Sequence, residues 1–132
     1  PNPKPQTPTP KIIFCNLLQN HLFLMNIHNL FENLPLINSK NEEFTEILNK
    51  GNVVIERIVS NGHHSESGFY YKQIQDEMVL IIEGQAELEI KDKENLFLKK
   101  GDYYFIPAGV EHRVVSTSIT TIWLAIHIYP SN

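Results

Sequence analysis

Cysteine is nearly absent from this sequence of 132 residues, which contains only Cys15. A single cysteine cannot form an intramolecular disulfide, so nothing points to an oxidising compartment and we expect a cytoplasmic protein. There is also no block of basic residues, and the net charge is −4. Nucleic acid is therefore not an expected partner.

Long hydrophobic runs are missing too. The most apolar stretch, residues 11–25, is interrupted by two asparagines, a glutamine and a histidine, which makes it too polar to span a bilayer. The sequence also lacks a Gly-rich phosphate loop, a Gly-x-Ser-x-Gly motif and a Cys-x-x-Cys motif. Hydrolase, kinase and disulfide-redox functions have no support from motifs.

The first 25 residues differ in character from the rest. Residues 1–10 are rich in proline and predict an extended segment without helix or sheet. We interpret residues 1–25 as a short irregular arm and residues 26–132 as one domain. Met25 leaves two hypotheses open: residues 1–24 are not native to the protein, or they form a genuine arm that packs on a neighbouring subunit.

Short strands are predicted through most of the remaining chain, because apolar and β-branched runs alternate with Gly, Asp and Pro turns. Residues 26–36 have the apolar spacing of a short helical turn or of a lid over one barrel end. Residues 42–48 fit a helix or a strand, and the turn Asn49–Asn52 favours strands on both sides. The predicted strands are Val53–Ser60, Glu77–Glu83, Gln85–Lys91, Asn95–Lys99, Tyr103–Ile106, His112–Ser116 and Thr120–Ile128. This pattern indicates an all-β sandwich or barrel.

The stretch from Gly101 to Arg113 organises the domain. It contains Gly101, five residues, Pro107, one residue, Gly109, two residues and His112. Glycine and proline favour turns on both sides of a short strand. The histidine begins the next strand, where it can point into the space that the strand encloses.

This spacing resembles the second motif of the cupins, and Glu77 with six residues before Gly84 resembles the first. The resemblance covers roughly residues 26–128. It implies a double-stranded β-helix, or jelly-roll, barrel. It also implies a metal site of three histidines and one glutamate, in which Glu77 and His112 stand at matching positions.

The His-x-His pair of that site is absent. Its positions hold Tyr71 and Gln73, or Tyr70 and Lys72 with the longer spacing. The candidate metal ligands are therefore Glu77, His112, Gln73 and His127. They would hold Fe, Mn, Ni, Cu or Zn, and a site without metal is the alternative.

Two histidine interpretations stay open. His127 shares one face of its predicted strand with Trp123 and Ala125, so it either approaches Glu77 or is a buried histidine bonded to a neighbour. His63 and His64 would supply a further ligand or lie solvated in their loop.

Aromatic residues are candidates for ligand binding: Tyr71, Tyr104 and Trp123 either line a small-molecule pocket or pack in the core. Exposed strand edges and apolar N-terminal residues predict a homodimer. Two function classes follow. One is a small metalloenzyme, dioxygenase- or isomerase-like, acting on a small polar molecule. The other is a non-catalytic binding or sensing domain without metal. No catalytic residue is assigned.

Overall fold

The computed structural model describes residues 26–131, and the chain divides into two units, Pro1–Glu32 and Asn33–Asn132. In the first unit the amide of Glu32 donates to the carbonyl of Asn29 at 3.1 Å. The predicted helical turn is thus a single hydrogen-bonded turn without a helix. The predictions for residues 1–25, including those on Cys15 and Met25, lie outside the described residues.

Eight strands make up the described part of the second unit, and they confirm the all-β prediction. Residues 42–48 fall mostly in a strand, as the turn at Asn49–Asn52 indicates. The strands are β1 (Glu43–Lys50), β2 (Val53–Ser60), β3 (Asp76–Glu83), β4 (Gln85–Ile90), β5 (Leu96–Lys99), β6 (Tyr103–Ile106), β7 (His112–Thr117) and β8 (Thr121–Ile128).

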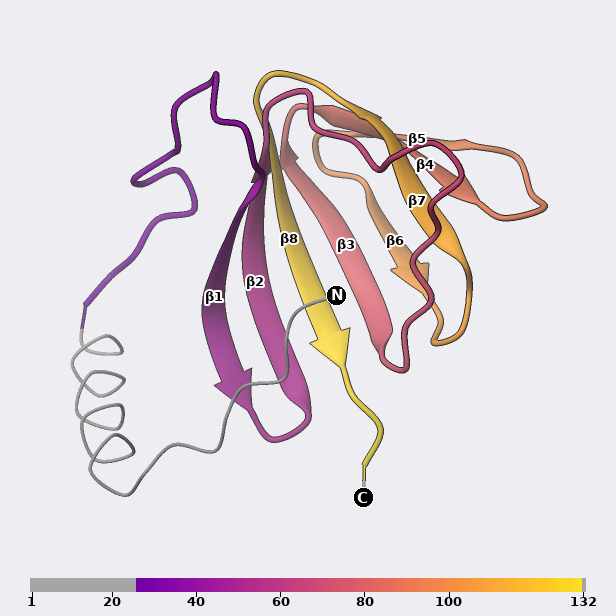
Figure 1. Cartoon of the computed structure of the whole chain (residues 1–132). Coiled ribbons are helices and arrows are strands. Elements are labelled where there is room, and N and C mark those ends of the chain that lie inside the picture. Colours follow the sequence, from indigo (N-terminus) through magenta and orange to yellow (C-terminus); the bar gives the residue numbers. More distant parts are fainter. Residues whose placement is uncertain (1–25, 132) are drawn as a thin grey trace. The chain divides into compact units, whose positions relative to one another are not determined.

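The strands form two antiparallel sheets. The larger sheet has the order β1-β2-β8-β3-β6, and the smaller has the order β5-β4-β7. The five strands of the larger sheet run side by side in Figure 1, with β8 between β2 and β3. Because β8 follows last in the chain, the sheet brings the C-terminal strand next to strands from the start and middle of the domain.

The hydrophobic core lies between the inner faces of the sheets. The larger sheet contributes Val79, Ile81, Ile106 and Trp123, and the smaller contributes Ala86, Leu88 and Leu98. On β4 the alternation predicted from the sequence is confirmed, because Ala86, Leu88 and Ile90 are all buried. Burial of apolar side chains on one face of each sheet is the main stabilising contribution in such a two-layer fold.

A segment without regular structure covers the free edge of β7. The backbone groups of Tyr71 and His112 bond to each other in both directions, at 2.7 and 3.1 Å, and the amide of Ser65 donates to the carbonyl of Val114 at 2.8 Å. Residues 65–71 therefore act as an irregular fourth strand of the smaller sheet. The pairing satisfies polar groups that an exposed strand edge would leave free.

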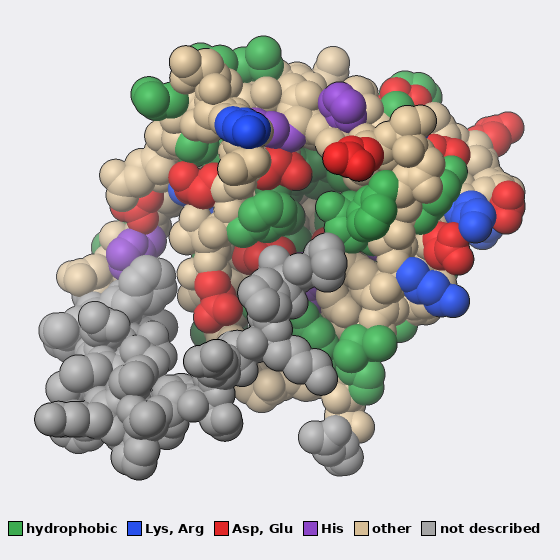
Figure 2. Space-filling model, in the orientation of Figure 1, with side chains coloured by type: hydrophobic (Ala, Val, Ile, Leu, Met, Phe, Trp, Pro, Cys, Tyr) green, Lys and Arg blue, Asp and Glu red, His purple; other side chains and the backbone are tan. Residues whose placement is uncertain are grey.

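The surface of the described residues is mixed in character. On the face drawn in Figure 2, acidic and basic side chains are interspersed with hydrophobic ones, and no continuous basic patch is visible. Within residues 26–131 there is also no helix long and apolar enough to cross a membrane.

Candidate functional site

Two predicted site residues lie opposite each other on neighbouring strands. Glu77 on β3 pairs directly with His127 on β8, so their side chains share one face of the sheet. That face is the inner one, because Ala125 and Trp123 alternate with outward-facing residues on β8 and are both buried. Glu77 and His127 are themselves 7% and 8% exposed. The predicted inner face of β8 is confirmed.

His112 reaches the same place from the smaller sheet. It begins β7 and pairs with Ile90, so its side chain points across the barrel. Its Nε2 lies 3.8 Å from Oε2 of Glu77, and Nε2 of His127 lies 3.9 Å from Oε1 of the same carboxylate. Glu77 therefore lies between two imidazoles contributed by opposite layers.

Glu56 on β2 completes the group and was not predicted as a site residue. Its Oε1 accepts a hydrogen bond from Nε2 of His127 at 2.9 Å. Alternation along β2 contains the signal, because Ile58 packs against the core and Glu56, two residues earlier, must share its face. We call Glu56, Glu77, His112 and His127 the inner cluster. Its side chains remain 7–13% exposed, so the cluster is not sealed from solvent.

In their neutral forms, the two histidines carry the ring proton on different nitrogen atoms. Nδ1 of His112 lies 3.0 Å from the carbonyl oxygen of Val110, and a carbonyl only accepts, so Nδ1 carries the proton. In the neutral ring Nε2 then has a lone pair facing Glu77. Nδ1 of His127 instead contacts the amide nitrogen of Gln75 at 3.3 Å, which leaves its Nε2–H to donate to Glu56.

Carboxylates around His127 favour its charged form. Burial alone would lower the pKa of His127, but the hydrogen bond to Glu56 and the charges of Glu77 and Glu56 raise this pKa above its ordinary value of 6.5. The pKa of Tyr71 is raised as well, first by burial and then by the charges of Glu42 and Glu77. Negative charge thus dominates the field at the cluster.

The raised pKa of His127 predicts a pH-dependent stability. The folded state holds this proton more tightly than the unfolded state, so the stabilisation is complete below about pH 6.5 and is lost as the pH rises through the folded pKa. We expect the free energy of unfolding in urea to fall between pH 6 and pH 8. Glu56→Gln removes the main partner and should flatten that dependence; an unchanged slope in this variant would contradict the assignment.

The other predicted site residues divide into two groups. Gln73 donates from Nε2 to Oε2 of Glu77 at 2.9 Å, and the ring of Tyr71 lies 5.9 Å from that of His112. Both lie beside the inner cluster. Tyr104 packs against the hydrophobic core and Trp123 is part of it, where Nε1 of Trp123 donates to Ser60 at 3.1 Å.

The loop histidines are engaged elsewhere. The ring of His63 accepts from the amide of Asn61 at 2.9 Å, and its Nε2 lies 2.9 Å from the carbonyl oxygen of Ser39. His63 therefore ties the loop to the chain before β1, a role that the sequence did not indicate. His64 is exposed, as expected for a solvated loop residue.

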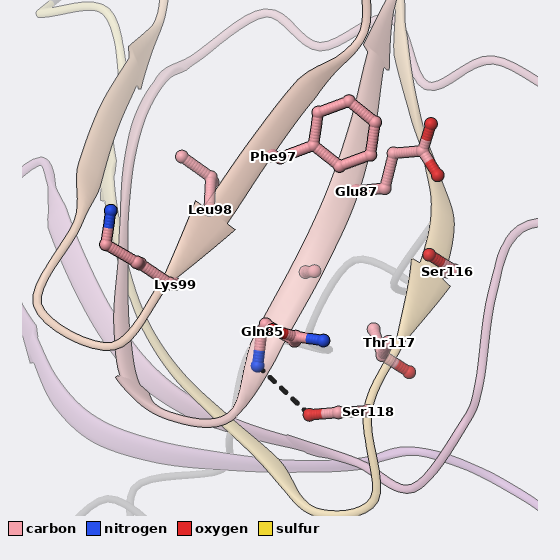
Figure 3. A pocket seen from close by; sticks show the side chains of 9 residues that line it. Gln85, Glu87, Phe97, Leu98, Lys99, Ser116, Thr117 and Ser118 are labelled. Atoms are coloured by element: carbon pink, nitrogen blue, oxygen red, sulfur yellow. Dashed lines mark hydrogen bonds between the residues drawn. The ribbon is translucent and has the colours of Figure 1, made fainter.

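A surface groove of about 460 Å³ lies on the smaller sheet, and no inner-cluster residue lines it. Figure 3 shows Phe97 and Glu87 on adjacent strands, with Ser118 bonded to the amide of Gln85. The groove is open and its polar groups do not converge on one point (Figure 3). We therefore place the candidate site at the inner cluster, where ionisable groups do converge.

The residues present do not fit a metal centre of three histidines and one glutamate. At the two missing positions, Tyr71 offers a ring beside His112, and Gln73 turns its amide nitrogen, which is not a ligand atom, towards Glu77. Nε2 of His127 is taken up by Glu56. In residues 26–131, no group of three or more His, Cys, Asp or Glu is arranged to hold a metal ion.

Known proteins share this fold and part of this sequence. A family model described as a cupin domain matches residues 59–127, just over half of the chain. A crystal structure of a putative mannose-6-phosphate isomerase from Ralstonia eutropha JMP134 is 35% identical, with a TM-score of 0.75, over 80% of this chain and 99% of that one.

Two further proteins are also similar to this chain. The uncharacterised protein YdbB of Bacillus subtilis is 37% identical over 54 residues, which is 41% of this chain and 41% of YdbB. The alignment thus spans well under half of YdbB. A conserved Streptococcus pyogenes protein of unknown function is 19% identical, with a TM-score of 0.66, over 81% of this chain and 90% of that one; at this identity it shows the fold alone.

Proposed function

The chain belongs to the cupin family, and on that premise we propose that its inner cluster binds a small polar molecule and isomerises it by proton transfer without a metal ion. The observation that carries the proposal is the position of Glu77, whose carboxylate lies 3.8 and 3.9 Å from the Nε2 atoms of His112 and His127. A carboxylate base beside one imidazole that can donate a proton and one that can accept it is an arrangement suited to acid–base catalysis.

Each group has a role in the proposed reaction. Glu77 removes a proton from the carbon beside a substrate carbonyl, and His127 donates to the carbonyl oxygen the proton that its Nε2 shares with Glu56. Reversal of both transfers at the neighbouring carbon yields the isomer, so no redox partner is needed. Glu56 positions His127 through its 2.9 Å hydrogen bond and favours the imidazolium form. The isomerase name of the Ralstonia relative supports this reaction class.

Solvent exchange tests the proposal. The protein is incubated in D2O with a panel of small hydroxyaldehydes and hydroxyketones, and proton NMR follows loss of the signal beside the carbonyl. Replacing a general base lowers the rate by roughly 10²- to 10⁴-fold, so Glu77→Gln should bring exchange close to background. Glu94→Gln makes the same charge change at an exposed position and should leave the rate unaltered.

Two results would count against proton transfer. Exchange that survives Glu77→Gln would remove Glu77 from the reaction. Binding of panel members without any exchange would favour the alternative function, a binding or sensing domain without turnover.

A divalent metal on Glu77 and His112 is the second candidate. It is favoured by one observation, the bond from Nδ1 of His112 to Val110 at 3.0 Å, because metal-bound histidines commonly donate their other ring N–H to a carbonyl. Elemental analysis of the protein used for the exchange assay separates the candidates. Near-stoichiometric metal that is lost in both Glu77→Gln and His112→Ala would establish the metal-dependent form.

The homodimer and the cytoplasmic location remain predictions. Exposed aromatic side chains on edge strands, such as Tyr103 and Phe105 on β6, support association of two copies. Light scattering, which measures the molar mass in solution, tests whether the protein is a homodimer.

A further inference from the structure

The charged groups at the inner cluster are mostly of one sign. Glu56 and Glu77 belong to the cluster, and Glu42 lies close enough to act on Tyr71 together with Glu77. Glu42 also accepts a hydrogen bond from Ser60, which in turn accepts one from Trp123. This chain fixes the Glu42 carboxylate on the inner side of the sheet. Three carboxylates therefore face the region of the two imidazoles, those of His112 and His127.

The nearby basic side chains are engaged elsewhere. Arg57 pairs with Glu43 at 2.7 Å on the opposite side of β2, and Arg113 pairs with Glu89 at 2.6 Å. Lys72 occupies one of the two alternative sets of His-x-His positions, but it is exposed. Across the part of the chain that the structure describes, no ion pair or hydrogen bond joins a lysine or arginine to the inner cluster.

The Nε2 atom of His112 makes no hydrogen bond within the described residues. His112 is 5% exposed, its Nδ1–H is used by Val110, and its Nε2 faces Oε2 of Glu77 at 3.8 Å, beyond hydrogen-bond distance. In the neutral ring, a lone pair and a carboxylate then face each other. An ammonium group can donate to Nε2 of His112 and to Oε2 of Glu77, which also accepts from Gln73, whereas an anion would add a third acceptor.

We propose that the inner cluster recognises a small polar ligand through an ammonium group held between Glu77 and His112, and that it excludes phosphate esters. This inference rests on the proposed function, since it names the ligand class of the same site. The charge balance favours the cation, because three carboxylates face the site and no lysine or arginine of the described residues is bonded to the inner cluster. The ring of Tyr71, beside His112, adds a face on which a cation is stabilised.

A matched set of three ligands tests the proposal: methyl α-mannoside, its 6-amino-6-deoxy derivative and its 6-phosphate. They differ at one position only and have no free aldehyde to react. Each is titrated into the protein at pH 7 while NMR follows the imidazole signals of His112 and His127. We expect the amine to bind at least tenfold more tightly than the phosphate.

Two variants test whether the preference for the amine arises from contact with Glu77. One charge-assisted hydrogen bond corresponds to roughly a 10- to 100-fold change in affinity, so Glu77→Gln should weaken amine binding by about that factor. Glu94→Gln should leave it unchanged. An equal loss in both variants would overturn the proposal, because it would show a general charge effect and not a contact.

Other results distinguish failure of the ammonium inference from failure of the proposed function. Tighter binding of the phosphate, or no response of the imidazole signals to the amine, overturns the inference. If the neutral mannoside binds as tightly as the amine and still depends on Glu77, the ammonium proposal fails while the proposed polar-ligand site stands. If none of the three perturbs the imidazoles and the exchange assay is also negative, both proposals fail.

Discussion

Gly84→Ala is expected to lower the free energy of unfolding by about 2 to 5 kcal/mol, the sum of left-handed backbone strain and overpacking. Gly84 joins β3 to β4 with a φ of +81°, and a Cβ there would lie 2.4 Å from the carbonyl oxygen of Thr120 and 2.9 Å from Cα of Thr121. Both obstacles are backbone atoms, so they cannot move aside as a side chain can. The measurement is urea unfolding followed by circular dichroism.

Gly109 supplies the matched control. Its φ is also +81°, but a Cβ at this position would meet nothing within 4 Å. Gly109→Ala should therefore cost only the backbone strain, about 1 to 2 kcal/mol. The difference between the two variants isolates the close contact with Thr120, and equal losses would show that this contact is unimportant. The same contact gives a physical reason for the glycine of the first cupin motif.

Trp123→Ala should cost about 3 to 5 kcal/mol, the usual range for removal of a large aromatic from a core. Trp123 is 4% exposed and contacts residues of both sheets in the hydrophobic core. The substitution also leaves Ser60 without the indole donor. Urea unfolding measures the loss.

Phe97→Ala is the comparison for this variant. Phe97 is also aromatic but is 75% exposed on β5, so its replacement should change the unfolding free energy by less than about 0.5 kcal/mol. If the two variants lost similar amounts, the larger part of the stability would not come from the interior between the sheets.

Local sequence patterns were sufficient to predict most of the fold. Turn residues such as Gly84 and Gly101 mark strand ends directly, and period-two alternation identifies the inner face of β4 and β8 without knowledge of any partner. Alternation put His127 on one face of β8 with Trp123 and Ala125, and strand pairing puts that residue opposite Glu77. These features depend on neighbouring residues in the chain.

The missed features depend on contacts between distant strands. Glu56 becomes a site residue only because β2 pairs with β8 in a register that brings it near His127, and no pattern within β2 states that register. His63 likewise bonds to Ser39, 24 residues earlier. The absent His-x-His pair, and Tyr71 and Gln73 at its positions, could be read from the sequence, but Glu56 beside His127 could not.

The pairing of Tyr71 with His112 couples the site to the edge of the smaller sheet that is covered by an irregular segment. Both backbone bonds to His112 come from a segment without regular structure, and such segments are the first to open in native-state hydrogen exchange. An opening that separates residues 65–71 from β7 frees the imidazole side of the cluster and, in the same event, exposes a strand edge to other chains. If this stretch opens easily, the site is accessible but the strand edge is exposed to aggregation. If the stretch stays paired, the edge is protected but access to the site is restricted.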